Sequence, residues 1–243
     1  MHFLNKLFSY ILLATTKHNI DESHGLSHSM NVLLYANQIY QHEVKTHPAL
    51  KPQKNVIFVS AMLHDMCDKK YVNETRGIDE IQRFLLQSKP PNSKNLRDFG
   101  VDIGMVNTGS VHPVKFTLHT PVPVVTIDEI EAIKKIITTM SYSKVKTHGY
   151  PVLGEYQHAY HIVREADLLS AYDFDRCIIY DMKRNNLDFT TSFQNSVDLF
   201  EKRIANYQSD QLFVTEYSKR LSVELHRQAI GRISAWRQLL RNV

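Results

Sequence analysis

The sequence is poor in cysteine, tryptophan and the residues that break secondary structure. Its 243 residues include two cysteines, one tryptophan, eight glycines and eight prolines. Cys67 and Cys177 cannot build a disulfide framework and do not form a C-x-x-C pair, which favours a reducing compartment. Internal repeats and low-complexity tracts are also missing. We therefore expect an ordinary globular protein of the cytoplasm.

Long hydrophobic runs are lacking as well. The apolar N-terminal stretch HFLNKLFSYILLATT is interrupted by Lys6 and is not followed by an A-x-A cleavage site, which favours an amphipathic first helix over a signal peptide. No later run approaches the length needed to span a bilayer. We therefore expect no membrane partner.

The excess of positive charge is small. A formal net charge of +4 and a pI near 8.9 suit a phosphate-bearing substrate but fall short of a dedicated nucleic-acid binder. We therefore expect a small phosphorylated partner and no stable nucleic-acid complex. The sequence leaves open whether the chain is a monomer or a homodimer.

Helical periodicity dominates what is present. Hydrophobic residues make up 43% of the chain, enough for a core, and no change in composition separates two halves. The sequence predicts one all-α domain over residues 1–243. Apolar spacing at i, i+3 and i+4 predicts helices near 2–16, 25–44, 51–67, 77–88, 127–142, 155–183, 193–207 and 211–241.

The helical pattern fails between residues 89 and 125. The stretch KPPNSKNLRDFG breaks a helix, and VKFTLHT alternates as a strand does. We expect a long inserted loop or small hairpin here. A loop of this length inside a compact domain is typically mobile or a lid over a site.

The stretch AMLHDMCDKK places His64 and Asp65 at the end of an apolar run. Adjacent helical residues point about 100° apart, so they share a target only where the helix ends or where a compact group such as a metal ion lies between them. A buried, unpaired carboxylate costs several kcal/mol, roughly, so Asp65 needs a cation or donors. An ordinary helix terminus is the alternative interpretation.

Upstream, DESHGLSHSMNVLLYANQI offers two further histidines. His24 and His28 lie one helical turn apart, and Asp21 or Ser23 can cap the helix. Apolar residues at every third or fourth position continue the stripe of His28, so His28 is expected to point inward. A core histidine with a satisfied hydrogen bond is the alternative.

Downstream, HAYHIVREADLLSAYDF places Asp167 among apolar neighbours within a helix, where a carboxylate needs a partner. Arg164, one turn earlier, is a purely structural candidate for that partner. Taken together, His28, His64, Asp65 and Asp167 form a mixed nitrogen and oxygen set suited to a divalent cation, with coordination positions left for water.

These motifs carry a resemblance to a known family. The pattern H…HD…D, with D-x-x-H-G-x-x-H before it, LHD followed by DKK, and EADLLSA in place of DADRLDA, resembles the HD-domain metal-dependent phosphohydrolases, nearest to the bacterial nucleotide-pyrophosphatase type. The resemblance runs from the first helix through Asp173 and more weakly into the tail. It implies a helical bundle with metal-binding helices over about 18–175 and closing helices over about 190–243.

The resemblance also implies a cofactor and a ligand set. One divalent ion, which could be Mn, Co, Mg, Ni, Fe or Zn, would be held by His28, His64, Asp65 and Asp167. The implied activity is hydrolysis of a phosphoanhydride or phosphomonoester bond of a nucleotide by metal-activated water.

Residues around the ligands receive roles on the same basis. A carboxylate in the position of Asp68 can orient or deprotonate the attacking water, although a helix-terminal turn residue is the alternative. Lys69 and Lys70 would neutralise substrate phosphates, unless they are ordinary solvated lysines, and His24 would donate a hydrogen bond to a phosphoryl oxygen. Arg164 would either clamp a phosphate or hold Asp167.

The chain departs from the family pattern at three positions. Asn31, Leu168 and Ser170 stand where the family has Arg, Arg and Asp. These changes bear on substrate choice more than on metal binding. They motivate an alternative function, a non-catalytic HD-type protein that regulates or binds a nucleotide.

Five other histidines invite a dinuclear site, as in HD-type phosphodiesterases and oxygenases. The helix expected over IDEIEAIKKIITTMS carries no histidine, and no histidine lies three or four residues before Asp167. The sequence therefore favours a single ion. The five histidines are His112, His119, His148, His158 and His161.

Overall fold

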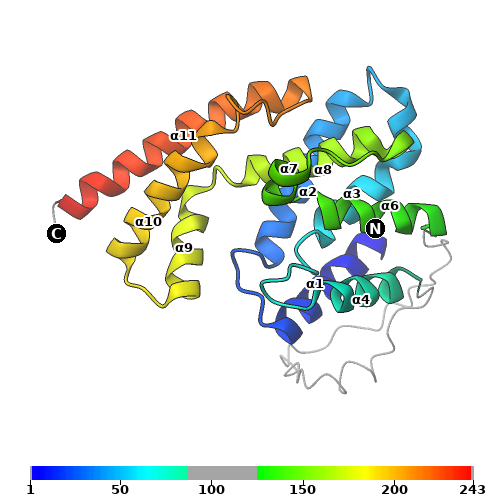
Figure 1. Cartoon of the computed structure of the whole chain (residues 1–243), viewed down its shortest axis with the longest axis horizontal. Coiled ribbons are helices and arrows are strands. Elements are labelled where there is room, and N and C mark those ends of the chain that lie inside the picture. Colours follow the sequence, from blue (N-terminus) through cyan, green and yellow to red (C-terminus); the bar gives the residue numbers. More distant parts are fainter. Residues whose placement is uncertain (1, 87–124, 242–243) are drawn as a thin grey trace, which may run out of the picture.

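The computed structural model describes residues 2–86 and 125–241. Within these two ranges every regular element is a helix, which confirms the all-α prediction for the described part of the chain (Figure 1). The loop or hairpin expected over 89–125 lies, except for its last residue, outside the described residues.

The described helices fall into two stretches, before and after residues 87–124. The first half contains α1 (His2–His18), α2 (Leu26–Glu43), the 3-10 turn η1 (Pro48–Gln53), α3 (Lys54–Leu63) and α4 (Glu74–Leu86). The second half contains α6 (Ile127–Thr139), α7 (Tyr142–His148), η2 (Gly154–Tyr156), α8 (Gln157–Ser170), α9 (Phe174–Asn185), α10 (Phe189–Lys202), η3 (Ile204–Asn206) and α11 (Glu216–Arg241).

The main difference from the predicted elements is a break in the helix expected over 155–183. Helix α8 ends at Ser170, and the side chain of Asp173 accepts a hydrogen bond from the backbone N–H of Arg176 to cap α9. Apolar residues keep a helical spacing across residues 171–173, so periodicity alone predicts one continuous helix. The preference of Asp for the N-cap position is the competing signal.

Smaller differences occur at helix ends. The expected helix 127–142 ends at Thr139, because the Ser141 side chain accepts a hydrogen bond from the backbone of Lys144 and starts α7. The expected helix 193–207 is α10 followed by η3. The expected helix 51–67 begins within the 3-10 turn η1 and ends at Leu63.

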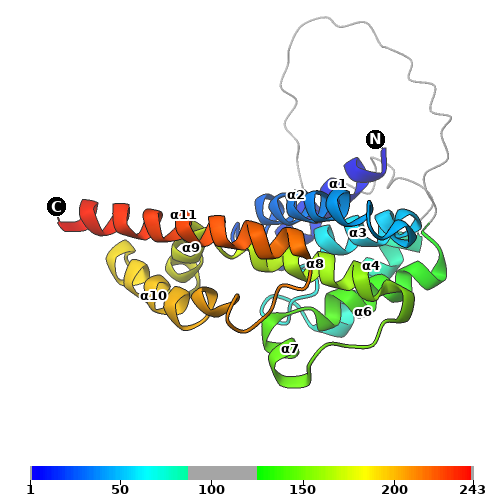
Figure 2. The ribbon, with the colours of Figure 1, turned by 90° about the horizontal axis from the view of Figure 1, so that it is seen from above.

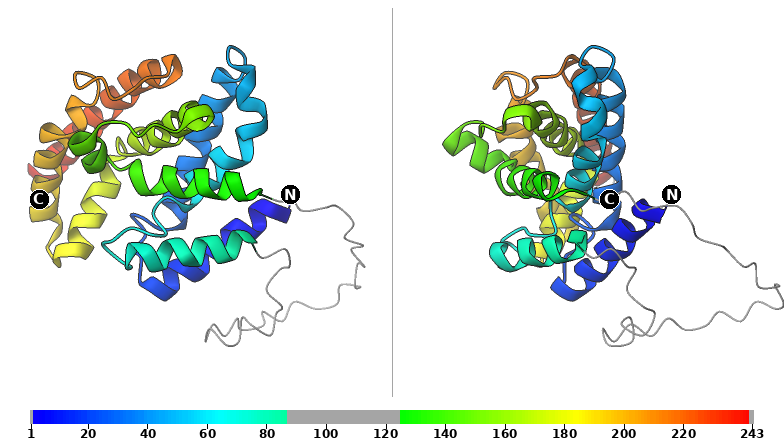
Figure 3. Two further views of the ribbon diagram at one scale, coloured as in Figure 1. Left: turned by 45° about the vertical axis from the view of Figure 1, so that its right-hand side comes forward. Right: turned by 90° about the vertical axis from the view of Figure 1, so that its right-hand side faces the viewer.

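The helices form a bundle and a projecting lobe. Helices α1 to α8 make the bundle, with α3 packed against α2, α6 and α8 (Figures 1 and 3). Helices α9 to α11, here called the C-terminal lobe, extend to one side, and α11 contacts α2 and α8 near its N-terminal end before it runs away from the bundle (Figure 2). Because α3 lies among three other helices, residues at its C-terminal end are enclosed.

One connected cluster of buried apolar side chains runs through both parts. It includes Leu7 of α1, Ile57 of α3, Val163 of α8 and Ile233 of α11. The single domain expected over residues 1–243 stays a prediction. None of the described helices combines the length and the apolar character that crossing a bilayer requires.

Helix α4 lies directly against the turn that follows α3. A Cβ atom added at Gly77 would lie 2.8 Å from the Cα and 2.9 Å from the Cβ of Cys67. These are distances that side chains do not tolerate, and the obstacle is largely backbone. The absence of a side chain at Gly77 therefore allows α4 to cover the turn that holds His64 and Asp65.

We predict that Gly77→Ala destabilises the protein by about 1–3 kcal/mol, as overpacking does in a close contact. Gly231→Ala is the matched control, because nothing lies within 4 Å of a Cβ at this exposed position of α11. It should stabilise by about 0.5–1 kcal/mol through helix propensity. Urea unfolding measures both free energies, and an unchanged or increased stability of Gly77→Ala would contradict the close approach.

Candidate metal centre

His64 and Asp65 lie in the turn immediately after α3, which ends at Leu63. Both are enclosed, with 7% and 8% of their surface exposed. The Nδ1 of His64 lies 2.9 Å from the carbonyl oxygen of Ala61, so this nitrogen carries the proton and donates. In the neutral ring Nε2 is then the free nitrogen, and a backbone carbonyl fixes its direction, as is usual for metal-binding histidines.

Three helices bring four side-chain atoms together. The Nε2 atoms of His28, on α2, and His64 lie 3.1 Å apart. Asp65 Oδ2 lies 3.2 Å from both nitrogens. Asp167 Oδ1, on α8, lies 3.5 Å and 3.6 Å from them. The four residues that the sequence singled out thus meet at one point.

The spacing of these atoms fits a divalent cation. Ligand bonds of about 2.1 Å place neighbouring ligand atoms about 3.0 Å apart in an octahedron and about 3.4 Å apart in a tetrahedron. The measured separations run from 3.1 Å to 3.6 Å. In addition, Asp65 Oδ2 is buried and makes no well-aligned hydrogen bond within the described residues. A buried oxygen in that state is suited to a cation.

The charges of the cluster point the same way. Burial alone would raise the pKa of Asp65, but the neighbouring His64 and His28 lower the pKa well below its usual range. For Asp167 the contacts with His28 and His64 likewise outweigh burial and lower its pKa. Burial would lower the pKa of His64, but the charge of Asp65 raises the pKa well above its usual value. The enclosed carboxylate of Asp65 therefore requires positive charge beside it, and Asp167, whose side chain is 28% exposed, adds a second negative charge.

Arg176, on α9, contacts the outer side of His28. Its Nη1 atom lies 2.7 Å from His28 Nδ1 and 2.8 Å from the carbonyl oxygen of Ser23. An arginine only donates, so His28 Nδ1 must accept in this arrangement. A neutral His28 that held a cation through Nε2 would carry its proton on Nδ1 instead, and Arg176 would then no longer donate to this ring.

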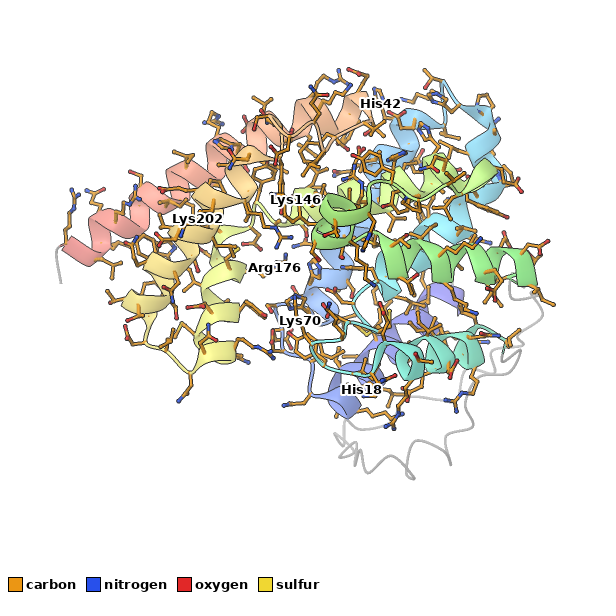
Figure 4. The ribbon with its side chains drawn as sticks, viewed as in Figure 1. His18, His42, Lys70, Lys146, Arg176 and Lys202 are labelled. Carbon is orange, nitrogen blue, oxygen red and sulfur yellow. The ribbon has the colours of Figure 1, made fainter. Side chains whose placement is uncertain are left out.

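Three of the four residues, His28, Asp65 and Asp167, line a pocket between the bundle and the C-terminal lobe, and His64 lies behind them. Charged side chains of the wall include Lys70, after α3, Arg176, on α9, and Arg203, after α10. Figure 4 shows Arg176 and Lys70 between the two parts of the molecule. The Arg203 guanidinium lies 4.3 Å from the centre of the Tyr142 ring, and within the described residues its buried Nε has no hydrogen-bond partner.

His24 joins this wall through a short hydrogen-bond network. Its Nδ1 atom lies 2.7 Å from Ser23 Oγ and 3.1 Å from Tyr71 Oη, and both hydroxyls bond to the carboxylate of Asp21. Burial, together with the nearby Lys70, lowers the pKa of His24 despite the opposing charge of Asp65. The ring is held neutral and in a fixed orientation beside the pocket. Asp21 and Ser23 serve this network, and the expected capping role is wrong, since α2 begins after Gly25 without a side-chain cap.

Asp68 combines the two interpretations given to it. Its Oδ1 accepts a hydrogen bond from the backbone of Lys70 at 2.9 Å, as a turn residue does, and its Oδ2 lies 3.5 Å from Lys70 Nζ. The side chain also lines the pocket, and carboxylate or ring atoms of His24, Asp65 and Asp68 lie within 4.8 Å of one another. Lys70 lines the pocket too.

Two predicted site residues lie elsewhere. Arg164 is 2% exposed, donates to the carbonyl oxygen of Leu212 and packs under the Tyr150 ring at 4.9 Å, so neither the phosphate clamp nor the contact to Asp167 is present. The side chain of Arg164 extends to the carbonyl oxygen of Leu212, in the segment before α11, and does not lie beside Asp167 on the surface of α8. Lys69 is exposed and is not among the described residues that line the pocket.

The remaining histidines of the described chain stay away from the centre. His158 lies 3.2 Å from Glu43, His161 lies 3.2 Å from Gln157, and His148 is exposed at the end of α7. His112 and His119 lie outside the described residues. Within the described chain, none of His148, His158 and His161 lies beside the candidate metal centre, and the expectation of a single ion stays a prediction.

The three positions that depart from the family pattern differ in their burial. Leu168 lines the pocket, and Ser170 is buried with its hydroxyl donating to the carbonyl oxygen of Asp167 at 2.7 Å. Asn31 is exposed on α2. Of the three, only Leu168 therefore meets the space where a substrate would lie.

Sequence reasoning missed Arg176 and Arg203. Both follow Asp173, where the predicted helix continued straight on and carried no motif. If Asp173 is recognised as an N-cap, the sequence predicts a new helix after it, and Arg176 then lies in the first turn of that helix. For Arg203 the sequence contains no comparable signal.

Comparison with known proteins adds a likeness in fold. No protein-family model matches the sequence, and no curated protein matches it significantly. A crystal structure of a protein from Lactobacillus plantarum, a Northeast Structural Genomics target, superposes with a TM-score of 0.60 at 17% sequence identity, covering 99% of this chain and 97% of that chain. The likeness is to the fold alone.

We predict that the full chain binds Mn²⁺ and that Asp167→Asn weakens this binding at least about tenfold, because the substitution removes one anionic ligand and keeps its volume. Asp79→Asn is the control, since Asp79 is exposed on α4. Titration followed by the EPR signal of free Mn²⁺ measures the affinities. Equal affinities of the wild type and Asp167→Asn would exclude this residue as a ligand.

Proposed function

We propose that the protein is a cytoplasmic, metal-dependent phosphohydrolase of the HD type that hydrolyses a phosphoanhydride or phosphomonoester bond of a nucleotide. The observation that carries the proposal is the meeting of His28, His64, Asp65 and Asp167, with each carboxylate oxygen 3.2–3.6 Å from both imidazole nitrogens, beside a pocket whose wall also bears cationic side chains. Such a pocket suits an anionic substrate placed beside a divalent ion.

An ion held by His28, His64, Asp65 and Asp167 would lower the pKa of a bound water and polarise a phosphoryl oxygen. The carboxylate of Asp68 lies beside Asp65, where it can accept a proton from the attacking water or orient it. The hydrogen bond from the backbone N–H of Lys70 to Asp68 Oδ1 fixes the orientation of this carboxylate.

The cationic wall supplies the phosphate contacts. Lys70 approaches from the bundle, while Arg176 and Arg203 approach from the C-terminal lobe. Arginine pairs with phosphate oxygens through two parallel hydrogen bonds, and lysine acts as a point charge. In the neutral ring of His24 the proton lies on Nδ1 and serves the hydroxyls of Ser23 and Tyr71, so donation to a phosphoryl oxygen would require the protonated ring and its Nε2 atom.

The rest of the wall suits the nucleoside. Tyr142, Tyr180, Tyr207, Leu199 and Ile204 line the same pocket from α7, α9, α10 and the segment after it. Aromatic faces stack on bases with little preference for sequence. A substrate with a base and sugar would therefore extend from the ion toward the C-terminal lobe.

We predict that the purified chain with Mn²⁺, Co²⁺ or Mg²⁺ releases phosphate or pyrophosphate from at least one nucleotide. Asp65→Ala should lower this activity at least about 100-fold, because it removes a metal ligand and leaves the buried histidines unpaired. Asp79→Ala, at an exposed position of α4, should keep the wild-type rate. A panel of nucleoside mono-, di- and triphosphates with product identification is the measurement.

The outcomes separate the two functions that the residues allow. Full activity of Asp65→Ala would remove the ligand assignment. Tight binding of a nucleotide by the metal-loaded protein without any product would favour the non-catalytic alternative, which the departure at Leu168 in the pocket motivates.

We predict that Arg203→Gln raises KM about tenfold with a smaller change in kcat, since a hydrogen bond to a charged group contributes about 1.5 kcal/mol and Arg203 lies in the wall away from the ligand atoms. Arg227→Gln, at a position whose side chain is 73% exposed on α11, should leave both constants unchanged. An unchanged KM for Arg203→Gln would show that the substrate does not reach the C-terminal lobe.

A further inference from the structure

We infer that the protein has a second cation site, formed by Glu43, His47 and His158 at the opposite end of the α2 and α8 pair. Glu43 Oε2 lies 3.2 Å from His158 Nε2 and 3.6 Å from His47 Nδ1. One ligand atom from each of the three residues lies within 4.8 Å of the other two. The inference does not depend on the proposed function.

The carboxylate at the centre of this cluster is enclosed. Glu43 is 5% exposed, although it occupies the last position of α2. Within the described residues its side-chain partners are all histidines, with His42 Nδ1 at 3.1 Å from Oε1 and the other two rings at Oε2. No lysine or arginine is paired with it there. A buried carboxylate requires positive charge, and a cation bound by two imidazoles provides it.

The two imidazoles are arranged to share one ligand. The rings of His47 and His158 lie with centroids 4.4 Å apart and planes inclined by only 34°, so one nitrogen of each faces the same carboxylate oxygen. They come from separate segments, the turn after α2 and the first turn of α8. Packing alone does not require two imidazole nitrogens to converge on one carboxylate oxygen, whereas binding of a cation does.

The donor set indicates which ions fit. Two imidazole nitrogens and one carboxylate oxygen favour borderline cations such as Zn²⁺, Co²⁺ and Ni²⁺ over Mg²⁺, which prefers oxygen. The His47 side chain is 52% exposed, so water can complete the coordination from the solvent side. The site is accessible without any opening of the bundle.

Its place in the fold indicates a structural role. Fifteen residues of α2 separate His28 from Glu43, which corresponds to about 22 Å along the helix axis at 1.5 Å per residue. An ion here would join the end of α2, the turn that follows and the start of α8. It would hold together the pair of helices that carry His28 and Asp167, far from the pocket.

The test uses the full untagged chain and Zn²⁺ alone. Equilibrium dialysis should show that His47→Ala loses one tightly bound Zn²⁺ per chain relative to wild type, and that His148→Ala, at another exposed histidine, loses none. The same pair is compared in an Asp65→Asn background, so that ions at the candidate metal centre are not confused with this site. His158→Gln provides a second variant that removes a different ligand.

A matching result in both backgrounds supports the site. Zn²⁺ should also raise the Tm of Asp65→Asn and not that of Asp65→Asn/His47→Ala, because an ion that binds only the folded state stabilises it. An unchanged number of bound ions in His47→Ala and His158→Gln would overturn the inference, as would the loss of an equal number in His148→Ala. Because no nucleotide is present, neither result bears on the hydrolase proposal.

Discussion

The contact of two carboxylates, one of them enclosed, with two buried imidazoles is the interaction on which the arrangement of this protein depends. Asp65 and Asp167 face each other across two imidazoles in a space enclosed by α2, α3 and α8. Placing the carboxylate of Asp65 there without positive charge would cost several kcal/mol, roughly. The three helices can therefore pack as they do only if the histidines, or a cation between them, hold the two carboxylates together. The end of α3, the close approach of α4 at Gly77 and the antiparallel course of α2 and α8 all serve this contact.

The break between α8 and α9 converts this cluster into the wall of a pocket. If the helix had continued past Ser170, the lobe that follows would point away from Asp167. The cap at Asp173 starts a new helix whose first turn places Arg176 2.7 Å from His28. The same turn allows α10 and the residues after it to bring Arg203 and Tyr207 to the opposite wall. A local preference of one aspartate thus decides which cations face the candidate metal centre.

Much of this could be predicted from the sequence, for reasons that differ between residues. His64 and Asp65 stood out because polar residues interrupt an apolar run, and the search for their partners led to His28 and Asp167. Periodicity located most helices, since burial of one face leaves a strong pattern. The roles of Arg164 and Arg176 could not be separated in this way. Long cationic side chains reach several positions from one backbone site, and only the packed structure fixes which carbonyl or ring they meet.

The two histidine clusters show how the same residue types are used at the two ends of one helix pair. At the candidate metal centre two carboxylates would balance a divalent charge, and the wall beyond them is cationic, so an anionic ligand would gain from both. At the other end one carboxylate meets two imidazoles near solvent, so a bound ion keeps part of its charge and has no pocket beside it. Charge balance and enclosure, more than the identity of the ligands, distinguish a centre suited to chemistry from one suited to holding helices together.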